Sequence, residues 1–318
     1  MGFLSNMYTK PGPGVGKDEP QKRRIVVFFE NFFRHFGRLE QTNLVFLLFS
    51  LPTVVLMFAL NFLMCKVVPN NGLLVNIVTF LPLSLLAVPL CGMTYLTRNF
   101  AREEHAFIWF DFIDQMKKNW KTALRHGLIS YFVYFCGYYA VRFYVFQSAQ
   151  HSKLLLVPGV IVGLILIAFT FAQYYIFPMM ITFDIPYRGV VKNGFLFSIM
   201  AFLRNLLMTV LHVVVWGIIL IYLSDVEHGG VIFGALLLLI GLPAFTSFLI
   251  NFVTYPVLVR YIIKPVYGSE EEQKAAPRED DHYKPIEDDD KEKSEYVFEN
   301  GRLVRRMDHV EQVFEDRK

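Results

Sequence analysis

Long apolar runs occur six times along the chain, and the charged residues lie in the segments between them. None of the runs contains Asp or Glu, and Arg142 is the only fixed charge inside them. Each run is near or above the roughly 20 residues that a helix needs to cross a bilayer. Because backbone groups in lipid must bond within their own segment, each run should be helical. The pattern predicts an all-α fold with six transmembrane helices at residues 44–64, 73–96, 127–147, 154–180, 205–223 and 230–259.

Lys and Arg are distributed unevenly between the two ends of these helices. The segments before spans 1, 3 and 5, together with Arg260 and Lys264 directly after span 6, hold eighteen of them, whereas the opposite connections hold only Lys66 and Lys153. Cytoplasmic connections carry the excess of Lys and Arg in membrane proteins. We therefore expect both termini to be cytoplasmic, which an even number of spans also requires.

The charge pattern divides the chain into three parts: a cytoplasmic N-terminal segment with an interfacial helix (1–43), a six-span membrane domain (44–263) and a cytoplasmic tail (264–318). From Gly268 to Lys318 there are 17 acidic and 10 basic residues. A segment so charged cannot bury enough apolar area to form a core. We expect the tail to be disordered, although 296–304 has the composition of a short strand or helix.

The segments before spans 1, 3 and 5 are apolar on one side and basic on the other. Residues 109–125 show this best, with apolar residues at helical spacing: Trp109, Ile113, Met116, Trp120 and Leu124. Helices of this kind lie in the membrane interface, with their basic side near anionic head groups. We therefore predict amphipathic interfacial helices before spans 1, 3 and 5.

An Asn stands at or near the start of each span that follows such a segment, at Asn43, Asn119 and Asn205. Their spacing is compatible with three repeated units, each an amphipathic helix followed by a transmembrane hairpin. The alternative is that any six-span chain alternates hairpins in this way.

The connection between spans 2 and 3 is the candidate interaction surface of the protein. Simple topological anchoring would explain its charges, whereas the functional alternative is a cytoplasmic docking surface for a partner. The residues assigned to it are Arg98, Arg102, Asp111, Asp114, Lys117, Lys118, Asn119 and Lys121.

Few residues in the sequence have the pattern of a catalytic or metal site. The chain contains no zinc-protease, phosphate-binding, nucleophile-elbow or dinucleotide motif. Glu103, Glu104 and His105 are adjacent, so they would point in different directions along a helix. The three cysteines have neither disulfide nor metal spacing. We predict a protein that is not an enzyme and that uses no cofactor or metal.

Five polar residues lie within the predicted spans: Asn61, Asn76, Gln173, His212 and Asn251. Interhelical hydrogen bonding is the simplest role for the amides. His212 is the one residue that could titrate within the membrane, although packing is the expected role. A second interpretation is that the five residues line a pathway for a solute.

The loop at 98–109, Arg-Asn-Phe-Ala-Arg-Glu-Glu-His-Ala-Phe-Ile-Trp, continues through Asp111-Phe112 to Lys118-Asn119-Trp120-Lys121. This segment, together with the opening Lys10-Pro-Gly-Pro-Gly-Val15, closely resembles bacterial YesL-like membrane proteins, a family of unknown function. The resemblance covers about residues 8–267. It implies a multi-pass protein of the bacterial plasma membrane, often encoded beside carbohydrate ABC importers, and it carries no catalytic or ligand-binding residues.

Two functions follow as hypotheses. The first is a non-enzymatic accessory subunit that presents its basic helices to subunits of a carbohydrate ABC transporter. The second is a self-sufficient transporter of a small or sugar-like solute. A membrane enzyme would require a cluster of His, Ser or acidic residues facing one cavity. The lipid bilayer is an expected partner and nucleic acid is not, while the sequence leaves the oligomeric state open.

Overall fold

The structure is a computed structural model that describes residues 23–225, 229–264, 296–299 and 302–305. The chain divides into two compact units, Met1–Val259 and Arg260–Lys318. In the first unit every regular element is a helix within the part that the structure describes. The predicted helical class therefore holds for the described membrane region.

The first hairpin begins with α2 (Arg24–Arg34), which joins α3 (Phe36–Val67) at His35. The return limb consists of α4 (Gly72–Phe80), the 3-10 segment η1 (Leu81–Leu86) and α5 (Ala87–Ala101). Pro82 is at the start of η1, and proline has no N–H for an α-helical hydrogen bond. The predicted second span is therefore interrupted near its middle.

The second hairpin consists of α6 (Ile108–Gln150), the short η2 (Lys153–Leu155) and α7 (Leu156–Thr182). Helix α6 has 43 residues, which corresponds to about 65 Å at 1.5 Å per residue. The amphipathic segment predicted before span 3 is thus not a separate helix, because 109–125 continues into 127–147 without a break. No proline occurs between Ile108 and Gln150, so nothing in the sequence ends the helix there.

The third hairpin follows α8 (Tyr187–Met200) and contains α9 (Phe202–Ser224), α10 (Gly230–Leu239) and α11 (Leu242–Leu258), with the π-helical turn η3 (Val259–Ile263) after it. The predicted sixth span is divided at Gly241, whose φ of +99° is in the left-handed region. Glycine adopts this conformation without steric cost. The break precedes Pro243 rather than being a kink at it.

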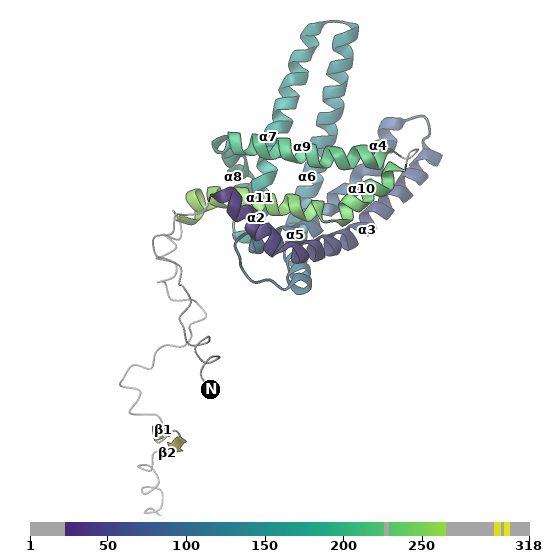
Figure 1. The fold of residues 1–318 in the computed structure, drawn as a ribbon. Coiled ribbons are helices and arrows are strands. Elements are labelled where there is room, and N and C mark those ends of the chain that lie inside the picture. Colours follow the sequence, from purple (N-terminus) through teal and green to yellow (C-terminus); the bar gives the residue numbers. More distant parts are fainter. Residues whose placement is uncertain (1–22, 226–228, 265–295, 300–301, 306–318) are drawn as a thin grey trace, which may run out of the picture. The chain divides into compact units, whose positions relative to one another are not determined.

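Five helical stretches are long and apolar enough to cross a membrane: Phe36–Val67, Gly72–Ala101, Lys153–Thr182, Phe202–Ser224 and Leu242–Ile263. The remaining predicted span, 127–147, lies in α6, which is less apolar because it has five Tyr and one Arg between these residues. Helix α10, the first part of the predicted sixth span, is too short to be among the five. The protein is therefore a helical membrane protein with several spans. Figure 1 shows α6 and α7 side by side, extending beyond helices that run across them, such as α9 and α11.

A buried hydrophobic core lies where α2, α3, α5, α6 and α11 meet. Phe28 of α2 packs against Phe248 and Phe252, with ring centroids 5.4 and 5.2 Å apart. Phe100 and Phe112 are completely buried in the same cluster. In the apolar stretch of Leu242–Ile263, which includes α11, half of the residues are buried, whereas in that of Phe202–Ser224, which is α9, the share is 11%. Helix α11 is thus central, whereas few residues of α9 are buried.

The second unit contains two short antiparallel strands, β1 (Tyr296–Glu299) and β2 (Arg302–Arg305), with Val297 opposite Val304. This hairpin lies at the position where the sequence allowed a short strand or helix. The rest of the predicted acidic tail, like the Lys10–Val15 segment, is outside the described residues.

Candidate functional site

The first part of the predicted interaction surface is used to hold the protein together. Arg98 donates hydrogen bonds to Asn99 Oδ1 at 2.7 and 3.0 Å and to Thr182 Oγ1 at 3.0 Å. The Arg102 guanidinium lies 4.2 Å from the Tyr255 ring centroid, and its side chain is only 13% exposed. These two arginines are therefore internal contacts of the helices and not an open surface.

Two further predicted residues stabilise α6 itself. Asp111 accepts a hydrogen bond from the Phe107 backbone N–H at 2.8 Å, which satisfies a donor that the helix start leaves free. Asn119 donates to the Gln115 carbonyl and side-chain oxygens, one turn earlier, at 3.2 Å each. These bonds of Asn119 thus lie within its own helix.

The remaining predicted residues form an exposed edge on α6, which we call the lysine edge: Lys117, Lys118 and Lys121, with Asp114 beside it. None of the three lysines makes an ion pair with any described residue. The Lys121 ammonium lies 5.6 Å from the Trp120 ring centroid. The lysine edge is the part of the predicted surface that is free to meet another molecule.

The buried side of this half of α6 differs from the predicted apolar face. Phe112, Ala123 and His126 are at most 1% exposed. Trp109 and Trp120, assigned to the apolar face, are each 48% exposed. This half of α6 therefore has three different sides. One side packs on the rest of the protein, a second carries the exposed tryptophans, and a third carries the lysines.

His126 is the centre of a buried polar network that sequence reasoning missed. Its Nε2 lies 2.7 Å from Gln173 Oε1, and its Nδ1 lies 2.9 Å from the Tyr187 hydroxyl. With the Gln173 amide oxygen facing it, Nε2 is the donor of that bond, because an amide oxygen can only accept. His126 thus connects α6, α7 and α8. The sequence shows only that a histidine lies one position before span 3, which does not by itself predict this network.

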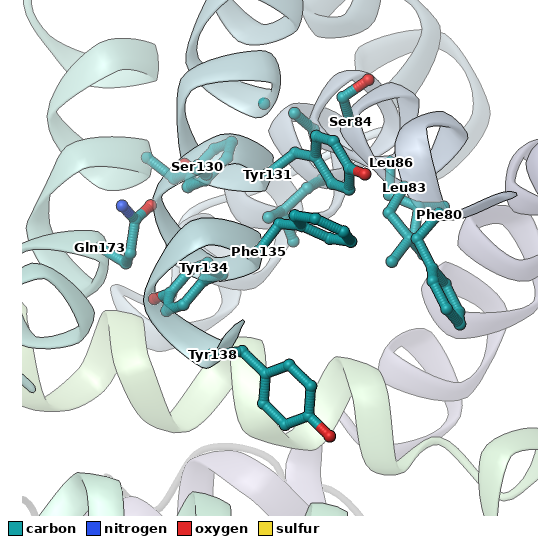
Figure 2. Close-up of a pocket in the computed structure, with 14 residues that line it drawn as sticks. Phe80, Leu83, Ser84, Leu86, Ser130, Tyr131, Tyr134, Phe135, Tyr138 and Gln173 are labelled. Carbon is teal, nitrogen blue, oxygen red and sulfur yellow. The ribbon is translucent and has the colours of Figure 1, made fainter. Parts of the chain in front are cut away.

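A cavity of about 410 Å³ lies next to this network, between η1, α6 and α7. Figure 2 shows Tyr131, Tyr134, Phe135 and Tyr138 on one side of it and Phe80 on the other. Besides the tyrosines, the residues of its lining with a polar side chain are Ser84, Ser130 and Gln173. An aromatic wall with a few amide and hydroxyl groups is the usual composition of a small-molecule site.

The cavity owes its shape to the interrupted second span. Gly127 of α6 packs directly on the backbone at Ser84 of η1. The Tyr131 hydroxyl donates to the Ile77 carbonyl oxygen at 2.5 Å. This contact satisfies a backbone oxygen in the turn that precedes η1. A regular second span would not present its backbone to α6 in this way.

The five predicted intramembrane polar residues belong to separate groups, and of the five only Gln173 lines the aromatic cavity. Asn61 donates to Thr79 at 3.4 Å, and Asn76 donates to the Tyr139 hydroxyl at 2.8 Å. His212 Nδ1 lies 2.8 Å from the carbonyl oxygen of Met208 in its own helix.

Asn251 is the most completely bonded of the five. Its amide nitrogen lies 3.0 Å from both Thr97 Oγ1 and the Ser247 carbonyl oxygen. The Thr97 and Ser247 hydroxyl oxygens are 2.8 Å apart. This group joins α5 to α11, as interhelical amides do in membrane proteins.

Two asparagines placed by the sequence at the start of spans bond to carbonyls at helix ends. Asn43 donates to the Leu238 carbonyl oxygen at 2.8 Å, at the end of α10. Asn205 donates to the Ser198 carbonyl oxygen at 3.1 Å, at the end of α8, and accepts from the Tyr175 hydroxyl at 2.8 Å. Both bonds satisfy carbonyls that a helix C-terminus leaves free.

The described residues contain no group of three or more His, Cys, Asp or Glu side chains placed to hold a metal ion. Comparisons with known proteins gave no match to a family model, a curated protein or a solved structure. The resemblance to YesL-like proteins and what it implies therefore remain predictions.

Proposed function

We propose that the chain is a non-enzymatic, six-span protein of the bacterial plasma membrane, with both ends in the cytoplasm, that serves as an accessory to carbohydrate ABC uptake. In this proposal the lysine edge of α6 contacts an acidic surface of a transporter subunit. The observation that supports it is that three exposed lysines, without an ion pair among the described residues, lie on one side of a long continuous helix.

The geometry of the helix favours docking over anchoring alone. Anchoring of the helix at the membrane interface needs aromatic side chains at the level of the head groups. The tryptophans on a neighbouring side of the helix already supply these. The buried residues Phe112 and Ala123 fix the other side of α6 against the protein. The lysine edge is therefore presented on a rigid support, which lowers the entropy cost of binding.

The proposal is tested by crosslinking the protein to its neighbours in membranes of the native host. Lys117→Gln/Lys118→Gln should lose crosslinks to transporter subunits. Lys66→Gln/Lys153→Gln removes the same charge from the predicted opposite side and should keep them. Equal crosslinking by the two variants, at equal insertion, or repeated purification of the protein alone in mild detergent, would refute the proposal.

A self-sufficient transporter is the second candidate, and the aromatic cavity is the observation that favours it. Aromatic side chains stack on sugar rings, and Gln173 and Ser130 offer polar contacts at its edge. Proteoliposomes loaded with candidate oligosaccharides should then show a flux that Gln173→Leu reduces. Absence of flux for every sugar tested would leave the accessory function.

A further inference from the structure

A second cavity, of about 520 Å³, lies between α2, α9 and α11, separate from the aromatic cavity. Two arginines, Arg24 and Arg204, are part of its lining, and both are exposed. The other lining residues are all apolar: Ile25, Phe28, Phe29, Leu211, Val215, Phe245, Leu249, Phe252 and Val253. No acidic residue contributes to its lining. The cavity therefore combines positive charge with a large apolar wall.

The two arginines are close enough to repel each other. The pKa of the Arg24 guanidinium is lowered, first by burial and then by the positive charge of Arg204. Arg24 donates one hydrogen bond, to the Phe252 carbonyl oxygen at 3.3 Å, and its guanidinium carbon lies 5.5 Å from the Phe252 ring centroid. A bound anion would relieve this repulsion, and the guanidinium fork matches the oxygens of a phosphate.

The apolar wall has the length of one membrane leaflet. Arg204 is in the first turn of α9, and the lining residues of that helix continue through Leu211 to Val215. Eleven residues of helix span about 16 Å. Half of a hydrocarbon core of about 30 Å is close to the same length. From the charged rim, the apolar wall thus extends over about the length of a lipid tail.

We propose that this cavity binds an anionic phospholipid, with its phosphate between Arg24 and Arg204 and one acyl chain along the groove between α9 and α11. Free phosphate would use the arginines and leave the apolar wall uncovered. A zwitterionic lipid would bring an ammonium group to a rim that has no carboxylate in its lining. Basic pockets between transmembrane helices recognise anionic head groups in this way. The site is independent of the accessory function proposed above.

The first test is native mass spectrometry of the purified full chain with phosphatidylglycerol, phosphatidylcholine or inorganic phosphate at matched concentrations. The wild-type protein should retain phosphatidylglycerol in preference to phosphatidylcholine. Arg24→Gln/Arg204→Gln should weaken phosphatidylglycerol binding by about 30-fold. Lys66→Gln/Lys153→Gln, which removes two exposed charges from the predicted opposite side, should bind as the wild type does.

The second test fills the groove and leaves the charges in place. Val215→Trp should reduce retention of phosphatidylglycerol, whereas Val214→Trp, at a 53% exposed neighbour that is not part of the lining, should not. Should Val215→Trp fail to fold, the arginine variants still decide the matter. Equal retention of the two lipids, unchanged binding by the double arginine variant, or displacement of phosphatidylglycerol by inorganic phosphate would overturn the proposal.

Discussion

Replacing Gly127 by Ala tests whether the packing of η1 on α6 stabilises the protein. A Cβ added at Gly127 would overlap the Ser84 carbonyl oxygen and lie 2.8 Å from the Ala87 Cβ and 3.1 Å from the Ser84 carbonyl carbon. Two of these three atoms belong to the backbone, so no side-chain rotation relieves the contact. The neighbouring bond from Tyr131 to the Ile77 carbonyl further limits how far η1 can move.

Overpacking of this kind costs about 1–3 kcal/mol, and it is opposed by the higher helix propensity of Ala, worth up to about 1 kcal/mol. We therefore expect Gly127→Ala to lower the apparent free energy of unfolding by about 1–2 kcal/mol. Gly163 in α7 is the matched control, because nothing lies within 4 Å of a Cβ added there. Gly163→Ala should be neutral or slightly stabilising.

Unfolding of the two variants and the wild type in the same detergent, followed by circular dichroism against added denaturant, measures the difference. Gly137→Ala should fall between them, because its Cβ would meet only Leu166 side-chain atoms, which can rotate away. If Gly127→Ala is as stable as Gly163→Ala, η1 does not pack against α6 as described, and the account of the aromatic cavity fails with it.

Two further predictions concern the helix contacts. Asn251→Ala removes the amide bond to Thr97 and should destabilise the protein by about 1 kcal/mol in the same assay, whereas Thr254→Ala, whose hydroxyl bonds only within α11, should cost less. The pKa of His35 is lowered by burial and by Arg38 and Arg34, and raised less by Glu103. The unfolded chain therefore binds more protons below pH of about 6.5. The unfolding free energy should fall between pH 7 and pH 5, and His35→Gln should reduce that slope. An unchanged slope in His35→Gln would show that other groups cause it.

Apolar length alone was sufficient to locate most of the membrane helices. Spans 1 and 5 lie within α3 and α9, and span 4 lies within η2 and α7; each of these three stretches is long and apolar enough to cross a bilayer. The continuity of α6 was not predicted, since the amphipathic pattern at 109–125 resembles that of a separate interfacial helix. A change of pattern marks a change of surroundings and not the end of a helix.

The positions of the prolines alone do not show where the helices are interrupted. Pro52 and Pro178 lie inside the continuous helices α3 and α7, whereas Pro82 begins η1. Whether a helix breaks depends on which neighbours satisfy the freed backbone groups. Tyr131 provides such a contact near η1. Contacts of this type, like those of His126, depend on residues distant in the sequence and leave no local pattern.

The continuity of α6 has a mechanical consequence. Lys117 and the cavity-lining Tyr131 are on the same uninterrupted helix, which has no proline between its two ends. A continuous helix without a hinge moves as one body, so a tilt or a shift at one end also moves the other end. If a partner bound at the lysine edge shifts α6, the aromatic side chains of the cavity, about four turns along the same helix, should shift with it.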